Sequence, residues 1–292
     1  MTNDVSTERT YPGGVPCLID VEHADPGAAA EFYGELFGWE FENKLPPGVD
    51  DKYLVASLHG SDVAAIASPT PGLTSATWNT YVCVADADVT VATAVAHGAE
   101  VLMPPVDAGP PGAIAGRWAA IADPDGAELR VWQPGYRHGA QLVNAPSTWN
   151  STDLTTADPD RAMAFYGAVF GWEAQPVDFG DADSFMLRQP GYGDFLAIRD
   201  PEITQRHAEP GVPEGFSDAI GWMTTADRST RWAVTFAVDG TDAVVERAEQ
   251  LGGVVVSPPT DHGGGVVRVA TLRDPQGADF IVSTYDPGAM SA

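Results

Sequence analysis

Basic side chains are scarce in this sequence. Its 292 residues include 15 Lys and Arg against 41 Asp and Glu, which gives a formal net charge of −26. Only two of the basic residues are lysines, Lys44 and Lys52. A surface of this sign repels phosphate backbones and anionic lipids. We therefore expect neither a nucleic-acid nor a membrane partner.

Cysteine and long apolar runs are also scarce. Two cysteines, Cys17 and Cys83, lie far apart in predicted strands. A disulfide framework needs more cysteines, and zinc sites use more closely spaced pairs, so we interpret both as small buried hydrophobic residues. No run approaches the ~18 consecutive apolar residues of a transmembrane helix. Residues 1–12 lack the basic start and apolar stretch of a signal peptide. We expect a cytoplasmic protein with a flexible segment at residues 1–12.

The sequence contains a tandem repeat. Three motifs of the first half recur in the second: ADP with FYGELFGWE (24–26 and 32–40; again at 157–159 and 165–173), GAEVLMPPVD (98–107; again at 252–261) and DPDGA (123–127; again at 274–278). The first of these recurs at a constant offset of 133 residues. At roughly 100–200 residues per domain, a duplication of this length indicates two domains. We predict an N-terminal domain over residues 13–136, a linker over 137–147 and a C-terminal domain over 148–288.

Each half divides again into two units of the pattern β-α-β-β-β. Asp25 followed by Pro26 is typical of a helix start, and Gly38 of the end of that helix. The strands predicted for the first half are 17–21, 53–58, 63–68, 80–84, 100–103, 117–122 and 128–133, and the second helix is 87–97. In the third unit we predict a strand at 194–199, followed by an inserted connection at 200–230 rich in Pro, Gly and charge.

These motifs together resemble the vicinal oxygen chelate superfamily, which includes glyoxalase I, bleomycin-resistance proteins and extradiol dioxygenases. The motifs that carry the likeness are FYGxxFGW after a strand, PP before a Gly-rich loop, and GRW with DPDGA before a final strand. Over about residues 14–288 the chain resembles the two-domain glyoxalase-like proteins of actinobacteria. The resemblance implies an α+β fold of four βαβββ modules. Each pair of modules forms one domain with an open, U-shaped, eight-stranded mixed sheet around a cavity.

The metal ligands that this resemblance implies are missing. Family metalloenzymes hold a divalent ion through His or Glu on the first strand of a module and Glu on the last. Counting from the FY and DP motifs, the equivalent positions are Leu18, Asn79, Ser151, Ala233, Arg130 and Ile281. None of these is a usual ligand, and the six histidines show no HxH or HxxxH spacing. We predict a metal-independent protein without another cofactor.

Residues two apart on a strand share a face, so each ligand position predicts its neighbours in the cavity. In the first half this face holds Leu18, Asp20, Asn79, Tyr81, Glu128, Arg130 and Trp132; in the second it holds Ser151, Asp153, Ala233, Thr235, Asp279 and Ile281. We predict Asp20 and Arg130 as catalytic residues. The predicted substrate-binding residues are Leu18, Asn79, Tyr81, Glu128, Trp132, Ser151 and Asp153. An Asp20–Arg130 or Glu128–Arg130 pair is equally consistent with a structural ion pair.

These residues leave three functions open. The first is a metal-independent isomerase, cyclase or hydroxylase-type step of secondary metabolism on an oxygenated aromatic or polyketide-like molecule. In it, Asp20 moves a proton and Arg130 stabilises an enolate or carboxylate. The second is non-catalytic binding of a small molecule, as in bleomycin-resistance proteins. The third is a metal-dependent lyase or dioxygenase. The sequence also leaves a homodimer open.

Overall fold

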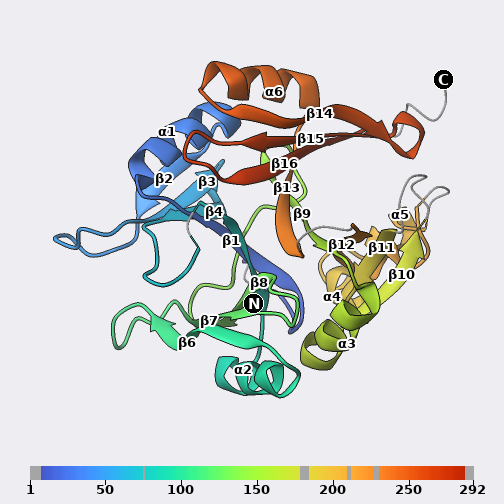
Figure 1. Ribbon diagram of the computed structural model, residues 1–292, viewed down its shortest axis with the longest axis horizontal. Coiled ribbons are helices and arrows are strands. Elements are labelled where there is room, and N and C mark those ends of the chain that lie inside the picture. Colours follow the sequence, from blue (N-terminus) through green and yellow to red (C-terminus); the bar gives the residue numbers. More distant parts are fainter. Residues whose placement is uncertain (1–7, 75, 178–183, 209–211, 227–229, 287–292) are drawn as a thin grey trace, which may run out of the picture.

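The computed structural model describes residues 8–74, 76–177, 184–208, 212–226 and 230–286. Two eight-stranded sheets, one from each half of the chain, make up the fold (Figure 1). In both sheets the two central strands run antiparallel to each other, and each pairs in parallel with its outer neighbour. The sheets are therefore mixed and open, and the predicted α+β fold of two glyoxalase-like domains is confirmed.

The N-terminal sheet has the strand order β2-β3-β4-β1-β5-β8-β7-β6. Its elements are β1 (Pro16–Glu22), α1 (Pro26–Phe37), β2 (Glu40–Asn43), β3 (Tyr53–Leu58), β4 (Ser61–Ala67), β5 (Trp78–Cys83), α2 (Ala87–Ala96), β6 (Glu100–Ala108), β7 (Gly116–Ala122) and β8 (Glu128–Pro134). The short edge strand β2 was not predicted, because three of its four residues are exposed and it has no apolar alternation.

The C-terminal sheet repeats this order as β10-β11-β12-β9-β13-β16-β15-β14. Its elements are β9 (Thr148–Thr156), α3 (Pro159–Phe170), β10 (Glu173–Val177), β11 (Ser184–Arg188), α4 (Tyr192–Ala197), α5 (Ile203–Arg206), η1 (Phe216–Asp218), β12 (Ala219–Thr225), β13 (Arg231–Ala237), α6 (Thr241–Gln250), β14 (Val254–His262), η2 (Gly263–Gly265), β15 (Val267–Arg273) and β16 (Asp279–Tyr285). None of the described helices is both long and apolar enough to span a bilayer.

The first helix of each half begins and ends at the predicted residues. The Asp25 carboxylate accepts a hydrogen bond from the Ala28 amide at 3.0 Å, which satisfies one free donor at the start of α1. At the other end Gly38 has φ 76°, a left-handed conformation that favours glycine, and its amide bonds to the Gly34 carbonyl. Asp158 and Gly171 do the same for α3.

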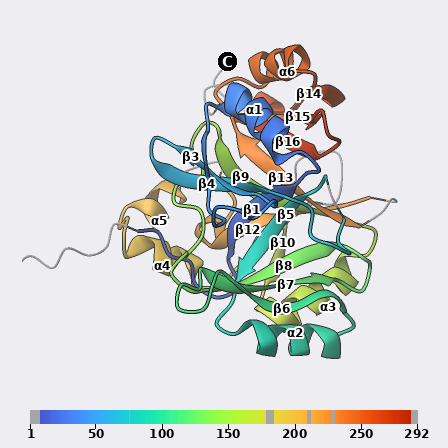
Figure 2. The same ribbon diagram turned by 90° about the vertical axis from the view of Figure 1, so that its left-hand side faces the viewer.

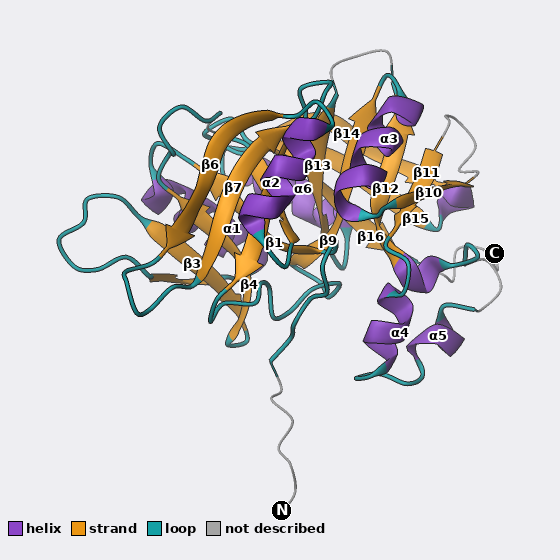
Figure 3. Ribbon diagram, turned by 90° about the horizontal axis from the view of Figure 1, so that it is seen from below, coloured by secondary structure: helices purple, strands orange, loops and turns teal. Residues whose placement is uncertain are grey.

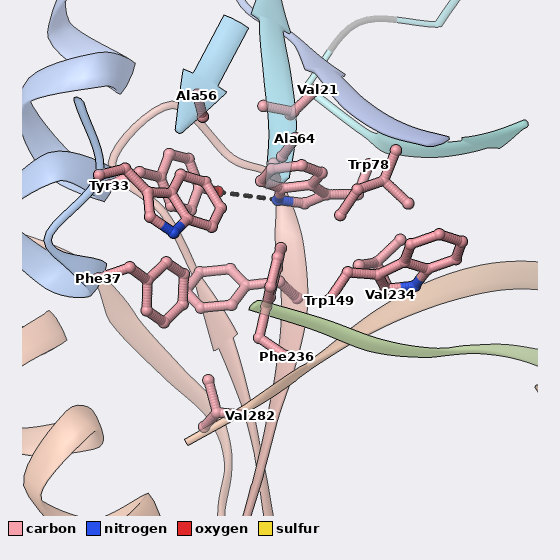
Figure 4. Close-up of a cluster of buried hydrophobic side chains, with 14 of the residues drawn as sticks. Val21, Tyr33, Phe37, Ala56, Ala64, Trp78, Trp149, Val234, Phe236 and Val282 are labelled. Carbon is pink, nitrogen blue, oxygen red and sulfur yellow. Dashed lines mark hydrogen bonds between the residues drawn. The ribbon is translucent and has the colours of Figure 1, made fainter. Parts of the chain in front are cut away.

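Two apolar cores join the halves. The first core combines β1, α1 and β4 of the first half with β13, α6 and β16 of the second, around Phe37, Trp39 and Phe236 (Figure 4). The second core combines β5, α2, β7 and β8 with α3 and β12, and includes Trp172. Helix α1 accordingly lies beside α6, and α2 beside α3 (Figure 1). The tryptophan that follows each of these helices, Trp39 after α1 and Trp172 after α3, is a core residue, since each is 4% exposed.

The repeated FY and DP motifs meet across the boundary between the halves. The Tyr33 hydroxyl donates to Asp274 at 2.8 Å and accepts from the Trp78 indole at 2.9 Å (Figure 4). In the second core Tyr166 donates to Asp123 at 2.8 Å and accepts from the Trp232 indole at 2.9 Å. The tyrosine of each FY motif thus bonds to the DP turn of the other half, which explains why both motifs recur.

We expect Tyr33→Phe and Tyr166→Phe each to lower the free energy of unfolding by about 1–2 kcal/mol, because each removes a hydrogen bond to a buried carboxylate. Urea denaturation would measure the loss. Tyr136→Phe is the matched control, since that ring is 65% exposed. A loss in the control equal to that in the buried pair would contradict the assignment.

The third module differs from its prediction. Residues 192–197 form helix α4 instead of a strand at 194–199, and the final strand of the module is β12. The inserted connection therefore lies between β11 and β12, and not over 200–230. The short apolar run after Gly191 is compatible with either a helix or a strand. Tertiary packing decides between them, because the strand that packs against the second core is β12, through Met223. Residues 209–211 and 227–229 of the predicted connection lie outside the described residues.

The insertion forms a separate small helical unit. Figure 3 shows α4 and α5 side by side, apart from the four helices that cover the sheets. The N-terminal segment contacts this unit, because the Arg199 guanidinium donates to the Glu8 carbonyl. The same segment also bonds to the connection between the halves, where the Tyr11 hydroxyl donates to the Ala140 carbonyl at 2.6 Å. Figure 2 shows the two sheets meeting at their central strands β1, β5, β9 and β13, where the Thr80 hydroxyl of β5 bonds to the Thr152 hydroxyl of β9 at 3.0 Å. Residues 1–7, predicted to be flexible, lie outside the described residues.

Candidate functional site

Each sheet has an inner face, which is the face turned away from the two cores. On the N-terminal inner face, strand register places Leu18 opposite Tyr81 and Asp20 opposite Asn79. Parallel pairing of β5 with β8 then places Arg130 beside Tyr81. The structure therefore brings these predicted site residues together on three adjacent strands.

A continuous hydrogen-bond network joins them. Asp20 accepts from the Asn79 amide at 2.9 Å and from the Tyr81 hydroxyl at 2.6 Å. The Arg130 Nη1 group donates to the Tyr81 hydroxyl at 2.8 Å and lies 3.4 Å from Asp20 Oδ1. Its Nη2 group lies 2.6 Å from the carboxylate of Glu22. Glu22 was missed in the sequence, although its spacing of two from Asp20 could have indicated it.

The network is closed to solvent. Asp20, Glu22 and Arg130 are 1%, 1% and 3% exposed. Burial raises the pKa of Asp20 above its usual value, and the nearby Arg130 charge and the Tyr81 hydrogen bond oppose this. Burial also disfavours the Arg130 charge, but Tyr81, Asp20 and Glu22 outweigh it and raise its pKa. Of the two structural alternatives, the contacts therefore favour an Asp20–Arg130 ion pair. Glu128 instead accepts from Thr74 at 2.8 Å.

Aromatic rings complete the N-terminal inner face. Trp132 meets Tyr81 edge-on with ring centroids 6.2 Å apart, and its indole donates to the Arg137 carbonyl at 2.9 Å. The Arg130 guanidinium lies 5.2 Å from the ring centroid of Trp118, which was not among the predicted site residues. Gly116 leaves room for Trp132, because a Cβ there would lie 2.3 Å from the indole.

The C-terminal inner face carries the same positions with different chemistry. Ser151 and Thr235 replace Leu18 and Tyr81, and both hydroxyls donate to Asp153, that of Ser151 at 3.0 Å. Ile281 stands where Arg130 stands in the first half, opposite Thr235 in register. Burial raises the pKa of Asp153 to about 6, and the two hydroxyl hydrogen bonds oppose the shift. No charged group in the described part of the chain contributes to the shift, so among these residues Asp153 lacks the cation that its counterpart Asp20 has.

The two inner faces also differ in exposure. Asp20, Asn79, Tyr81 and Arg130 are buried, whereas Ser151, Asp153, Ala233 and Ile281 are half-buried. A half-buried aromatic residue, Trp222, lies opposite Asp153 in register, and Phe216 of the insertion packs against it with ring centroids 6.3 Å apart. The predicted residue Asp279 is instead exposed and pairs with Arg273 at 2.6 Å. The C-terminal inner face is thus the more exposed of the two around its carboxylate.

Comparison with known proteins gives the family. A family model described as a glyoxalase-like domain matches residues 18–132 and 151–283. The chain belongs to the glyoxalase-like domain family. It is 36% identical over 275 residues to "Putative glyoxylase CFP32" of Mycobacterium tuberculosis, covering 93% of this chain and 95% of that one. It is 33% identical over 296 residues to "Anthracycline biosynthesis protein DnrV" of Streptomyces peucetius, covering 97% of each chain.

Solved structures show the same fold at low identity. The Mn(II)-bound glyoxalase from Novosphingobium aromaticivorans aligns with a TM-score of 0.55 at 15% identity, covering 93% of this chain and 82% of that one. The 2,3-dioxygenase LapB from Pseudomonas sp. KL28 aligns with a TM-score of 0.55 at 13% identity, covering 94% and 93%. These structures show the fold alone, and the family model confirms the predicted glyoxalase-like membership.

The side chains present do not fit the divalent metal that some members of this superfamily bind. Among the described residues, no three His, Cys, Asp or Glu side chains are grouped to hold an ion. On the N-terminal inner face the carboxylates of Asp20 and Glu22 already pair with a guanidinium. On the C-terminal inner face Asp153 is accompanied only by hydroxyls. A resident ion needs three or more such ligands in most protein sites.

Other recurring charged residues of the family fold are structural. Arg117 bonds to Asp88 at 2.7 Å and to Asp107 at 2.9 Å. Arg268 contacts Asp242 and Asp261 in the same way at 2.6 and 2.8 Å. Each arginine joins the first turn of a helix to the end of a strand, which is a structural role. A groove of about 460 Å³ beside α3 is lined by apolar residues such as Trp172 and Met223 and lies on the core side of the C-terminal sheet.

The raised pKa of Asp153 predicts a stability cost at neutral pH. Between its ordinary value of 3.8 and about 6, the folded chain binds more protons at this carboxyl than the unfolded chain, so stability falls as the pH rises through this window. We expect Asp153→Asn to raise the free energy of unfolding by about 1–2 kcal/mol at pH 7.5, a range reduced for partial solvent exposure. The gain should vanish near pH 4. Urea titrations at both pH values would measure it, and an equal gain at pH 4 would contradict this origin.

Proposed function

We propose that this chain binds an oxygenated aromatic, polyketide-like small molecule on the C-terminal inner face and catalyses a proton transfer on it through Asp153. The observation that carries the proposal is the half-buried Asp153 carboxyl, which has a pKa of about 6 and pairs with no cation among the described residues. Titratable groups perturbed in this way concentrate at functional sites. The relative named for anthracycline biosynthesis supports a role in the secondary metabolism of aromatic polyketides.

The lining of this face indicates the class of ligand. Trp222 and Phe216 offer aromatic surface beside Asp153, and Ile281 adds apolar surface on the next strand but one. Ser151 and Thr235 offer hydroxyls to oxygen substituents. Aromatic walls with a few polar groups suit planar rings that carry phenol or ketone oxygens. An anionic ligand is disfavoured, because none of the described residues places a cation beside an ionised Asp153 to offset the repulsion.

The chemistry follows from the protonation of this carboxyl. Near pH 6 it is present in both forms, which suits a group that removes a proton from one atom and returns it to another. The ionised form takes a proton from a phenol or from a carbon next to a ketone, and the protonated form then donates it elsewhere on the ligand. No described cation adjoins Asp153 to stabilise the resulting anion, so the ligand must delocalise the charge over its own rings. This requirement favours conjugated ketones and phenols, in an isomerisation or cyclisation.

The N-terminal inner face supports a different role. Asp20 and Arg130 were predicted to be catalytic, but a substrate would have to replace the contacts that they make with each other and with Tyr81 and Glu22. Because each charge is already compensated, we assign this network to holding β1, β5 and β8 together. The alternative function is binding of a small molecule without catalysis, which requires no titrating group. The following experiment distinguishes it from catalysis.

Incubation of the purified protein with a panel of hydroxylated aromatic and polyketide ketones, followed by liquid chromatography–mass spectrometry, tests the proposal. We expect an isomer of unchanged mass to form in the presence of a chelator, and one deuterium to be incorporated in D₂O. A compound that is retained but recovered unchanged, without deuterium, would show a binding protein instead. Turnover that requires added metal would contradict the proposal.

A further inference from the structure

The four helices that cover the sheets form two layers that the duplication makes equivalent. Helices α1 and α6 contact each other in one layer, and α2 and α3 in the other (Figure 1). The repeat aligns α3 with α1 at an offset of 133 residues and α2 with α6 at an offset of 154. The structure supports the second alignment, because Asp88 of α2 and Asp242 of α6 each pair with the equivalent arginine, Arg117 or Arg268.

The two layers differ in charge. At four exposed positions the α1–α6 layer carries a glutamate where the α2–α3 layer carries a small apolar residue. The equivalent residues are Glu31 and Ala164, Glu35 and Ala168, Glu246 and Ala92, and Glu249 and Val95. The ion pair between Glu35 and Arg247, which joins α1 to α6, cannot form in the other layer, because Ala168 and Thr93 occupy its two positions.

The outer surface of the α2–α3 layer is therefore apolar and almost free of charge. Its exposed apolar residues are Val89, Ala92, Val95, Ala96, Ala164 and Ala168. Val89 and Val95 are 62% and 49% exposed. The charged residues of α2 and α3 all lie in the first turn of a helix; they are Asp88, Asp160 and Arg161. A continuous apolar surface from which charged residues are depleted is typical of the centre of a protein–protein interface.

We propose that the α2–α3 layer is the docking surface for a second copy of this chain, in a two-fold dimer in which α2 of each copy faces α3 of the other. Each chain carries a net charge of −26, so two copies repel each other. The α2–α3 layer reduces this repulsion, because it lacks the four glutamates of the equivalent layer. It also offers a basic partner few carboxylates. A second α2–α3 layer matches it in charge, and the exposed valines of α2 then pack on the alanines of α3.

Docking at this layer leaves both inner faces open. Helices α2 and α3 cover the second core, which lies on the side of the sheets opposite to the inner faces. The dimer therefore does not depend on the proposed activity of Asp153. The groove of about 460 Å³ beside α3 adds apolar surface at the border of the layer, through residues such as Met163 and Phe185.

Sedimentation velocity of the full chain over a series of protein concentrations tests the proposal. We expect a reversible equilibrium between monomer and dimer. The dimer fraction should rise with protein concentration. It should also rise as NaCl is increased from about 0.05 to 0.5 M, because salt screens the repulsion between the two acidic chains.

Two double variants give the α2–α3 layer the charge of the α1–α6 layer. They are Ala92→Glu with Val95→Glu on α2, and Ala164→Glu with Ala168→Glu on α3. Each should raise the dissociation constant of the dimer at least about 100-fold, because it places like charges in an apolar interface. The four positions are exposed and glutamate favours helices, so the variants should keep the circular dichroism spectrum of the wild type.

A matched control adds two carboxylates to the other layer. Ala243→Glu with Gln250→Glu changes two exposed residues of α6 and should leave the dissociation constant unchanged. A wild-type chain that stays monomeric at every protein and salt concentration would overturn the proposal. A dimer that survives in both α2 and α3 variants, or that the control abolishes as well, would place the interface elsewhere and overturn it equally.

Discussion

Replacement of Asp153 by Asn is expected to lower kcat/KM for the proton transfer by about 10²–10⁴-fold, the usual contribution of a general acid–base group. The substituted amide keeps the size of the side chain and its place between Ser151 and Thr235 but cannot carry the proton. The same variant is expected to be more stable at neutral pH, so unfolding cannot account for the loss. Asp242→Asn, at an exposed ion pair with Arg268, should retain wild-type kinetics.

The pH profile gives a sharper form of this test. Wild-type kcat/KM should rise with pH through a limb near pH 6 if ionised Asp153 is the base. Ile281→Arg would place a guanidinium at the position that Arg130 occupies in the other half. We expect this variant to move the limb to lower pH, because a neighbouring cation favours the ionised carboxyl. An unmoved limb, or full activity in Asp153→Asn, would remove Asp153 from the mechanism.

The second large effect concerns stability. We expect Arg130→Met to lower the free energy of unfolding by about 3–5 kcal/mol, because it leaves two buried carboxylates without a cation and removes a donor to Tyr81. Denaturant unfolding at pH 7.5 would measure the loss. Arg117→Met is the matched control: this arginine also pairs with two carboxylates, but at the surface, and its replacement should leave the urea midpoint nearly unchanged.

The outcome for Arg130 also separates the two roles considered for this residue. A stable Arg130→Met protein that no longer binds or converts the ligand would restore the prediction that Asp20 and Arg130 form the catalytic pair. A protein that loses stability but, under native conditions, keeps ligand affinity at the C-terminal inner face would assign Arg130 to the scaffold. The measurements of stability and of ligand affinity in this variant therefore distinguish a catalytic role of Arg130 from a structural one.

The sequence by itself determined the duplication, most strands, the helix ends and the family. These follow from local signals: Asp25 and Gly38 mark helix ends through hydrogen bonds and dihedral angles within one turn, and the FY and DP motifs repeat in order. Strand alternation also placed Asp20, Tyr81 and Arg130 on one face, because side-chain direction has a period of two. The strand predicted at 194–199 was wrong, because the apolar run there is short and is compatible with either a helix or a strand.

Only the tertiary structure decided how these faces differ. Sequence spacing does not show that Arg130 reaches Glu22 as well as Asp20, or that this closes the N-terminal inner face while the equivalent face around Asp153 stays half-open. Burial and charge pairing depend on strand register between segments 61 to 110 residues apart. The chemistry of a site arises from those distances, and a local pattern of residues does not contain them.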